Sequence, residues 1–158
     1  MVMVVTADEA KREAFSRFVR LTEPRLLRAL GLLRGHEAGR DATAEALSWA
    51  WEHWTEVQEM ENPAGYLYRV GASRSRVRKI GLAAVSQTEP VPMFEPGLEP
   101  ALAGLTDRQR TAVVLIHGCG WTHQEVADAL DLSRSSVSTH VDRAMAVLRS
   151  KLGVIDHG

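Results

Sequence analysis

Residues 133–143 combine hydroxyl and basic side chains in a pattern that could bind nucleic acid. The sequence SRSSVSTHVDR begins with short hydroxyl residues and carries arginines near both of its ends. Short side chains let a helix backbone approach DNA closely, while hydroxyl and guanidinium groups bond to phosphates or base edges. The side chains that we predict to contact DNA here are Arg134, Ser135, Ser136, Ser138, Thr139, His140 and Arg143.

A second concentration of positive charge lies in residues 61–80, although the whole chain has a formal net charge of −1. This segment holds five basic side chains and one acidic side chain, which gives a local balance of 5 − 1 = +4. Such a stripe can bind phosphates by releasing counterions even when the chain is nearly neutral overall. Tyr66 and Tyr68 interleave with this charge and could either stack on unpaired bases or pack in the core.

Three potential metal ligands, His117, Cys119 and His123, lie within seven residues. A structural zinc site needs four ligands, and Cys119 is the single cysteine of the chain, so we predict no metal site. The sequence also lacks a phosphate-binding glycine loop and a nucleophile elbow. We therefore expect no catalytic activity and no cofactor.

The apolar residues that must position these side chains recur at helical spacing almost throughout, and no stretch alternates as a strand would. The sequence therefore predicts an all-α fold of two small helical domains joined by a proline-rich linker. The first domain, residues 8–80, is expected to be a four-helix bundle. Its helices are predicted at about residues 8–20, from Pro24 to Gly35, and at about 41–60 and 64–80.

Residues 81–100 contain four of the six prolines and are predicted to be an extended linker without helix or strand. The second domain, residues 101–152, carries capping-box patterns at Thr106–Gln109 and Thr122–Glu125, which mark helix starts. The last two of its helices are predicted to form a helix-turn-helix. We expect the helices of this domain at about residues 107–117, 122–130 and 133–151.

The composition excludes several classes of protein. With 158 residues, of which 45% are hydrophobic, the chain is long and apolar enough to fold. No segment approaches the ~20 apolar residues of a membrane helix, and the N-terminus lacks the pattern of a signal peptide. A single cysteine suits a reducing compartment, so we expect a soluble cytoplasmic protein without membrane insertion.

Three motifs in order resemble a bacterial RNA polymerase sigma factor of the extracytoplasmic-function group, which has two helical domains called regions 2 and 4. The stretch DATAEALSWAWEHW, residues 41–54, resembles the family's helix that docks on the clamp helices of the largest polymerase subunit. The stretch NPAGYLYRVGASRSRVRK, residues 62–79, resembles the family's segment that captures and melts the −10 promoter element. Residues 105–149 resemble the family's domain that reads the −35 element.

The resemblance implies a role for each motif and places the −35 contacts within the hydroxyl-rich helix described above. It assigns polymerase contact to Asp41, Glu45, Leu47, Ser48, Trp49 and Glu52. It assigns contact with −10 DNA to Tyr66, Tyr68, Arg69, Ser73, Arg74, Arg76, Arg78 and Lys79. Trp51 and Trp54 share a helix face, so Trp49 is expected to face elsewhere and to lie on a partner surface.

Four positions depart from the family pattern. Ala44 and Leu47 replace a usual glutamine and phenylalanine, and Ser73 and Val77 replace a usual asparagine and aspartate. The resemblance implies an initiation factor whose partners are core RNA polymerase, through its clamp helices and flap region, promoter DNA and an anti-sigma factor. The departures keep a second hypothesis open, a sigma-like DNA-binding regulator or interaction protein without promoter-opening activity.

Overall fold

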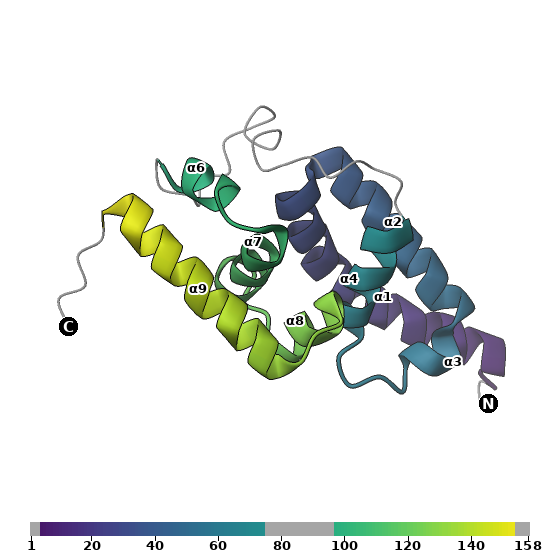
Figure 1. Ribbon diagram of the computed structural model, residues 1–158. Helices are drawn as coiled ribbons and strands as arrows, with labels where there is room; N and C mark the ends of the chain where they lie inside the picture. The colour runs from purple at the N-terminus through teal and green to yellow at the C-terminus, as the bar shows by residue number, and fades with distance from the viewer. Residues whose placement is uncertain (1–3, 75–96, 154–158) are drawn as a thin grey trace.

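The computed structural model describes residues 4–74 and 97–153, and within these ranges it contains helices and no strand (Figure 1). The predicted all-α fold is confirmed. The first part of the chain forms α1 (Ala7–Arg34), α2 (His36–Glu52), α3 (Trp54–Val57) and α4 (Pro63–Arg74). The second part forms α6 (Leu98–Ala103), α7 (Asp107–Val113), the π-helix η1 (Val114–Gly118), α8 (His123–Leu130) and α9 (Arg134–Leu152).

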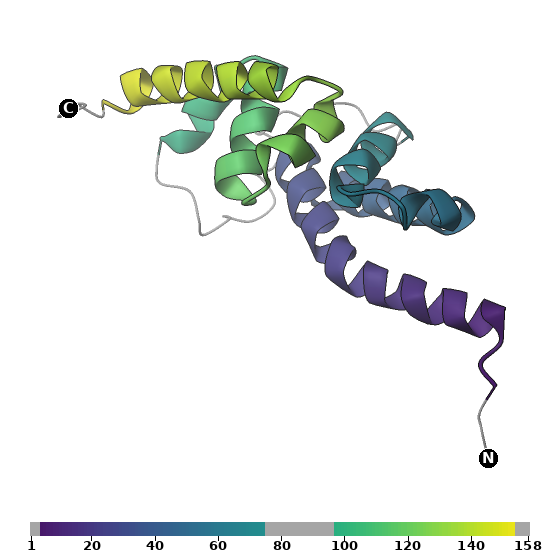
Figure 2. The ribbon, with the colours of Figure 1, turned by 90° about the horizontal axis from the view of Figure 1, so that it is seen from below.

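The prediction of two helices before Gly35 is wrong, because α1 runs unbroken through Pro24. Proline removes one backbone N–H and one helical hydrogen bond, but the following turns bury Leu26 and Leu30 completely, and this packing holds the helix together. Figure 2 shows that α1 bends along its length instead of running straight. Gly35, at a φ of 97°, then turns the chain sharply into α2.

The helix predicted at about residues 41–60 is divided differently in the structure. α2 starts earlier, at His36, and ends at Glu52, after which α3 follows as a single turn. The early start follows from packing, because Gly39 lies so close to α1 that a Cβ there would be 2.6 Å from the Gly31 nitrogen. The contact between helix backbones therefore extends α2 beyond the residues whose apolar spacing predicts it.

An aromatic cluster joins the N-terminal half of α1 to α2 and α3. The ring of Phe15 lies 5.0 Å from that of Trp51 and 5.4 Å from that of Trp54, both in edge-on geometry. Phe18 makes a third edge-on contact, with Trp54, at 5.3 Å between centroids. Edge-on arrangements place the positive rim of one ring against the negative face of another. The cluster thus anchors the start of α1 on the first helical bundle.

The predicted linker, residues 81–100, lies mostly outside the described residues, but its last part is helical. α6 begins at Leu98 and includes Pro100, so the expectation of no helix there is wrong. Pro100 is the third residue of α6, where a backbone N–H would have no helical partner in any case. Leu102 is buried in a cluster that also contains Leu148 of α9, and this contact fastens α6 to α9.

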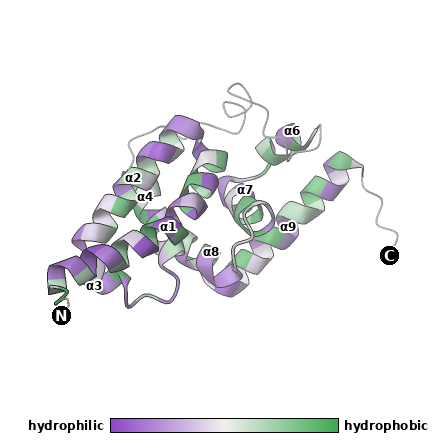
Figure 3. Ribbon diagram, turned by 180° about the vertical axis from the view of Figure 1, so that it is seen from behind, coloured by the Kyte–Doolittle hydropathy of each residue, from purple (hydrophilic) through white to green (hydrophobic). Residues whose placement is uncertain are grey.

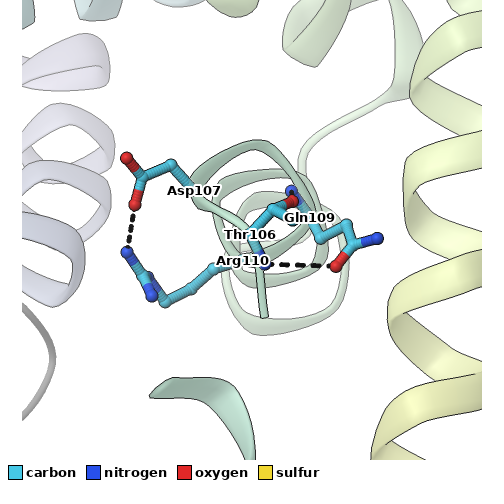
Figure 4. A network of polar contacts seen from close by, with 4 residues as sticks. All are labelled: Thr106, Asp107, Gln109 and Arg110. Carbon is cyan, nitrogen blue, oxygen red and sulfur yellow. Dashed lines mark hydrogen bonds and ion pairs between the residues drawn. The ribbon is translucent and has the colours of Figure 1, made fainter. Parts of the chain in front are cut away.

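The capping box predicted at the start of α7 is confirmed (Figure 4). The Thr106 hydroxyl accepts the Gln109 N–H, and the Gln109 side chain accepts the Thr106 N–H, each at 3.2 Å. Asp107 and Arg110 add an ion pair of 2.6 Å on the adjoining face. Beyond Val113 the helix continues as η1, so the predicted single helix corresponds to α7 together with a π-helical turn.

Hydrophobic side chains form a core that continues from the first part of the chain into the second. One cluster contains Leu30 of α1 and Leu67 of α4 together with Leu115 of η1 and Val126 of α8. Figure 3 shows hydrophobic and hydrophilic residues alternating along α9, as expected for a helix with one buried face. The two parts therefore pack against each other through an apolar interior, with α8 beside α4 (Figure 1).

Candidate nucleic-acid interface

Helices α8 and α9 form the predicted helix-turn-helix. The capping box predicted for α8 is confirmed, since both Thr122–Glu125 hydrogen bonds are present at 3.1 Å. Asp131 ends α8 in the left-handed region at a φ of 54°, which aspartate adopts more readily than most residues. The Leu132 N–H then donates to the Ala127 carbonyl at 2.9 Å. These bonds fix where α9 starts relative to α8.

The helix α9 buries one face and leaves the opposite face accessible, as its sequence predicts. The buried stripe consists of Val137, Val141, Ala144 and Leu148. Of the predicted DNA contacts, the exposed ones are Arg134, Ser135, Thr139 and Arg143. The half-buried ones are Ser136, Ser138 and His140. The predicted contacts therefore occupy the accessible face of α9 and its margins.

Hydroxyl groups at the start of α9 are ordered by hydrogen bonds among themselves. The Ser133 hydroxyl accepts the Ser136 N–H at 3.1 Å and donates to the Ser136 hydroxyl at 2.9 Å. The Thr139 hydroxyl donates to the Ser135 carbonyl at 3.1 Å. By contrast, Nδ1 of His140 is buried and finds no hydrogen-bond partner among the described residues. The bonded hydroxyls lie close to the helix surface, which lets a DNA groove approach the backbone.

We expect Ser133→Ala to lower the free energy of unfolding by about 1 kcal/mol, because the Ser136 N–H loses its capping acceptor. Urea denaturation followed by circular dichroism would measure this change. Ser150→Ala, at an exposed position of the same helix, is a matched control and should alter stability by no more than about 0.5 kcal/mol. Equal losses from the two substitutions would contradict the capping role of Ser133.

The residues predicted to contact −10 DNA lie on α4 in contrasting environments. Ser73 and Arg74 are exposed at its C-terminal end. Tyr66 is half-buried, and its ring centroid lies 5.3 Å from that of Trp49. The Arg69 guanidinium lies 4.9 Å from the centroid of the Tyr66 ring. Three further predicted contacts, Arg76, Arg78 and Lys79, lie outside the described residues. Within the described residues, the exposed part of the predicted −10 surface is thus the C-terminal end of α4.

Tyr68, also predicted to contact −10 DNA, is packed in the interior with 5% of its surface exposed. Its ring meets that of Trp121 edge-on, with 5.9 Å between centroids. Burial raises the pKa of Tyr68 to about 12, although the charge of Arg34 and its hydrogen bond to the phenol oppose the shift. The packed arrangement therefore requires the neutral phenol.

We expect the folded state to lose stability between about pH 10 and about pH 12, because it holds the Tyr68 proton more tightly than the unfolded chain does. The contribution is complete below the unfolded pKa of about 10, and above it stability falls by up to ~1.4 kcal/mol per pH unit. Urea denaturation across this range would measure the slope. Tyr68→Phe should lose stability less steeply, and an identical slope in that variant would assign the effect to another group.

The residues predicted to contact polymerase form a polar stripe along α2. The exposed members are Asp41, Glu45, Ser48 and Glu52. Their spacings of 4, 3 and 4 place them on one face of the helix, and three of the four carry a carboxylate. Leu47 is half-buried. This face of α2 is therefore an acidic surface.

Trp49 does not share this exposure, and the expectation that it faces away from the core is wrong. Only 8% of its surface is exposed, and its ring stacks on that of His53 at 4.1 Å between centroids. α2 packs against both α1 and α4, so it has two buried sides, and Trp49 faces Tyr66 on the second. The tryptophan spacing alone identifies one buried side of a helix but not the other.

Sequence reasoning missed a set of polar contacts between the two parts of the chain. Side chains of the first part meet groups of the second in three pairs, Arg25–Glu125 at 2.7 Å, Arg69–Asp131 at 3.1 Å and Arg28 to the Gly118 carbonyl at 2.9 Å. A cavity of about 500 Å³ also lies between the parts, lined among others by Arg34, Arg69, Arg108 and Arg110. In the sequence each of these side chains is typical of a solvated helix surface, so no local pattern predicts the contacts.

The sequence predicts no metal site at His117, Cys119 and His123, because the chain has a single cysteine. Cys119 is half-buried, and burial raises the pKa of its thiol against the opposing charges of Arg28 and Arg25. Across residues 4–74 and 97–153, no three His, Cys, Asp or Glu side chains gather as a metal ion would require. In the same ranges no helix is long and apolar enough to cross a membrane.

Two comparisons with known sequences find similarity to sigma factors. Residues 101–150 match the family model described as Sigma-70, region 4. The chain is 28% identical over 151 residues to an RNA polymerase sigma-E factor of Streptomyces coelicolor, with 87% of this chain and 85% of the relative covered.

Two solved structures share the fold. One is the sigma factor RpoE from Bartonella quintana, solved with the anti-sigma factor NepR, at a TM-score of 0.68 and 22% identity, covering 90% of this chain and 98% of that one. The other is CnrH, solved with the cytosolic domain of CnrY, at a TM-score of 0.62 and 21% identity, covering 90% and 89%. Residues 101–150 thus match sigma-70 region 4, and over most of its length the chain is similar in sequence to an RNA polymerase sigma-E factor and in fold to the two solved structures.

Proposed function

We propose that this protein is a transcription initiation factor that binds core RNA polymerase and directs it to promoters by recognising −10 and −35 elements. The observation that carries this proposal is the helix-turn-helix within the region 4 match, whose second helix has an accessible face of hydroxyl and arginine side chains. A helix of this kind fits the major groove of DNA, where such side chains reach base edges and phosphates.

Each remaining surface supports one part of this role. The acidic face of α2, with Asp41, Glu45 and Glu52, is the proposed contact with the clamp helices of the largest polymerase subunit. The exposed C-terminal end of α4 leads into the basic segment that we assign to −10 DNA. Region 4 is the part that we assign to the flap region. A regulatory anti-sigma partner is supported by the relative from Bartonella quintana, which was solved with one.

A chain with a net charge of −1 can still direct DNA binding under this proposal. The factor acts inside a larger assembly, so it needs positive charge only where phosphates meet its own surface. Arg134 and Arg143 supply such charge on the accessible face of α9, and the segment 61–80 supplies it beside the −10 element.

Run-off transcription tests this proposal directly. Core polymerase with and without the protein would be given a pool of genomic fragments from its own host, and the transcripts would be sequenced. We expect start sites that depend on the protein and that share two upstream elements. If no transcript depends on the protein while it still co-elutes with core polymerase, the chain occupies the enzyme without opening promoters, and the initiation role is refuted.

A further inference from the structure

The cavity of about 500 Å³ lies where α1, α4, α7 and α8 come together (Figure 1). Its lining is formed by the last turns of α1 and α8, the C-terminal half of α4 and the start of α7. Small-molecule sites in proteins usually have volumes of roughly 300–1,000 Å³. The cavity is therefore large enough to hold an organic ligand.

Positive charge predominates in the lining of this cavity. Four arginines from three helices line it, namely Arg34, Arg69, Arg108 and Arg110. Among the described lining residues Asp107 is the single acidic one, so the balance is 4 − 1 = +3. Asp131 pairs with Arg69 from outside the lining, and with its charge included the balance is still 4 − 2 = +2. A hollow that gathers charges of one sign beside apolar groups concentrates the electric field and attracts ions of the opposite sign.

Two of these arginines have no carboxylate partner among residues 4–74 and 97–153. Arg34 forms a hydrogen bond with the neutral phenol of Tyr68, and Arg108 is exposed. Arg110 does pair with Asp107, but this carboxylate bonds to only part of the guanidinium, which carries five N–H donors in a planar fork. Phosphate oxygens match the geometry of that fork and accept two of its N–H groups together. The lining therefore offers several donors to a phosphate group.

The lining also has an apolar part and two hydroxyl groups. The apolar side chains are those of Leu33, Ala72, Ala129 and Leu130, and the hydroxyls belong to Ser73 and Thr111. An inorganic anion would leave the apolar side chains in contact with water, whereas an apolar group on the ligand would cover them. A cavity of this volume does not admit a DNA duplex. The combination thus favours a small molecule that joins a phosphate group to an apolar body.

We propose that this cavity is a binding site for a phosphorylated small molecule with an apolar body, which is the chemistry of a nucleotide. The phosphate groups lie against the arginines of α7 and the end of α1, and the body lies against Leu33, Ala72 and Leu130. The site goes beyond the proposed function. Its test is a binding measurement without polymerase or DNA, so failure of the initiation role would leave the result unchanged.

Isothermal titration calorimetry of the full chain tests the site with three probes, which are ATP, inorganic tripolyphosphate and adenosine, all without divalent cations. We expect ATP to bind most tightly, tripolyphosphate more weakly because it lacks the apolar body, and adenosine most weakly because it lacks the phosphates. Adenosine binding as tightly as ATP would overturn recognition of phosphate. Equal affinities for ATP and tripolyphosphate would overturn the organic ligand, and no binding of either at about 1 mM would overturn the site itself.

Removal of single arginines locates the binding. Arg110→Gln should weaken ATP binding about tenfold, because only 17% of the Arg110 side chain is exposed and its hydrogen bonds to phosphate are shielded from water. Arg108→Gln should weaken it about threefold, because Arg108 is exposed and its charge is screened. Arg149→Gln is the matched control, since it removes the same charge from an exposed position of α9 outside the lining. Equal weakening in all three variants would show attraction to any positive surface and overturn the site.

A substitution that fills the cavity without changing charge decides the place of the apolar body. Ala72→Leu adds three carbon atoms to a half-buried lining position of α4. We expect it to weaken ATP binding by about tenfold and to leave tripolyphosphate binding unchanged, while circular dichroism confirms the helical fold. Ala103→Leu, at an exposed position of α6 outside the lining, is the control and should bind ATP as wild type does. Unchanged ATP binding by Ala72→Leu would overturn the proposal, and if that variant fails to fold, the arginine variants still decide it.

Discussion

Replacement of Leu67 by alanine is expected to lower the free energy of unfolding by about 2–5 kcal/mol, the largest effect that we predict for a single substitution. Leu67 has none of its surface exposed and lies in the cluster that α1, α2 and α4 share. Alanine would lose the transfer energy of the leucine side chain and leave a cavity. Small domains are stable by about 5–15 kcal/mol, so this loss is a large fraction of the total.

Urea denaturation followed by circular dichroism would measure the loss. Leu21→Ala is the matched control, because Leu21 lies on helix α1 with 76% of its surface exposed. The control should change the free energy of unfolding by less than about 0.5 kcal/mol. If Leu67→Ala were as stable as Leu21→Ala, the packing of α4 described here would be wrong.

Arg143→Ala is expected to weaken binding of region 4 to its −35 duplex by about ten- to a hundredfold, which corresponds to ~1–3 kcal/mol. Arg143 is exposed on the accessible face of α9, where a guanidinium can reach a guanine or a phosphate. Fluorescence anisotropy with the duplex defined by run-off start sites, set against a scrambled duplex of the same length, would measure the change.

Arg149→Ala removes the same charge from the same helix and serves as the control. Arg149 is exposed in the last turn of α9, away from the hydroxyl-rich start, so its loss should leave discrimination between the duplexes unchanged. An equal loss of affinity on specific and scrambled DNA would demote Arg143 to a phosphate contact. Equal behaviour of Arg143→Ala and Arg149→Ala would remove α9 from base recognition altogether.

Features that depend on neighbouring residues in the chain were predictable from sequence. The capping boxes at Thr106 and Thr122 and the buried stripe of α9 follow from hydrogen bonds and spacings within a few residues. The same holds for the turn at Asp131–Ser133, where a short polar residue ends one helix and another caps the next.

Features that depend on distant residues were not predictable in this way. Pro24 has the local signature of a helix start, but burial of the following leucines carries the helix through it. Trp49 lies off the face shared by Trp51 and Trp54, but a second packed helix buries it. Glu125 has the signature of a cap, and only the fold brings Arg25 to its other oxygen. In each case a tertiary contact supplies the deciding energy.

Pro24 divides α1 into two segments that have different partners. Pro24 has no N–H to donate to the Arg20 carbonyl, so the helix loses one of its regular hydrogen bonds at this turn. Before Pro24, Phe15 packs in the aromatic cluster. After Pro24, Arg25 and Arg28 contact the second part of the chain. A change in the angle of α1 at Pro24 would therefore move the residues that contact the second part of the chain without breaking helical hydrogen bonds in the segment that the aromatic cluster anchors.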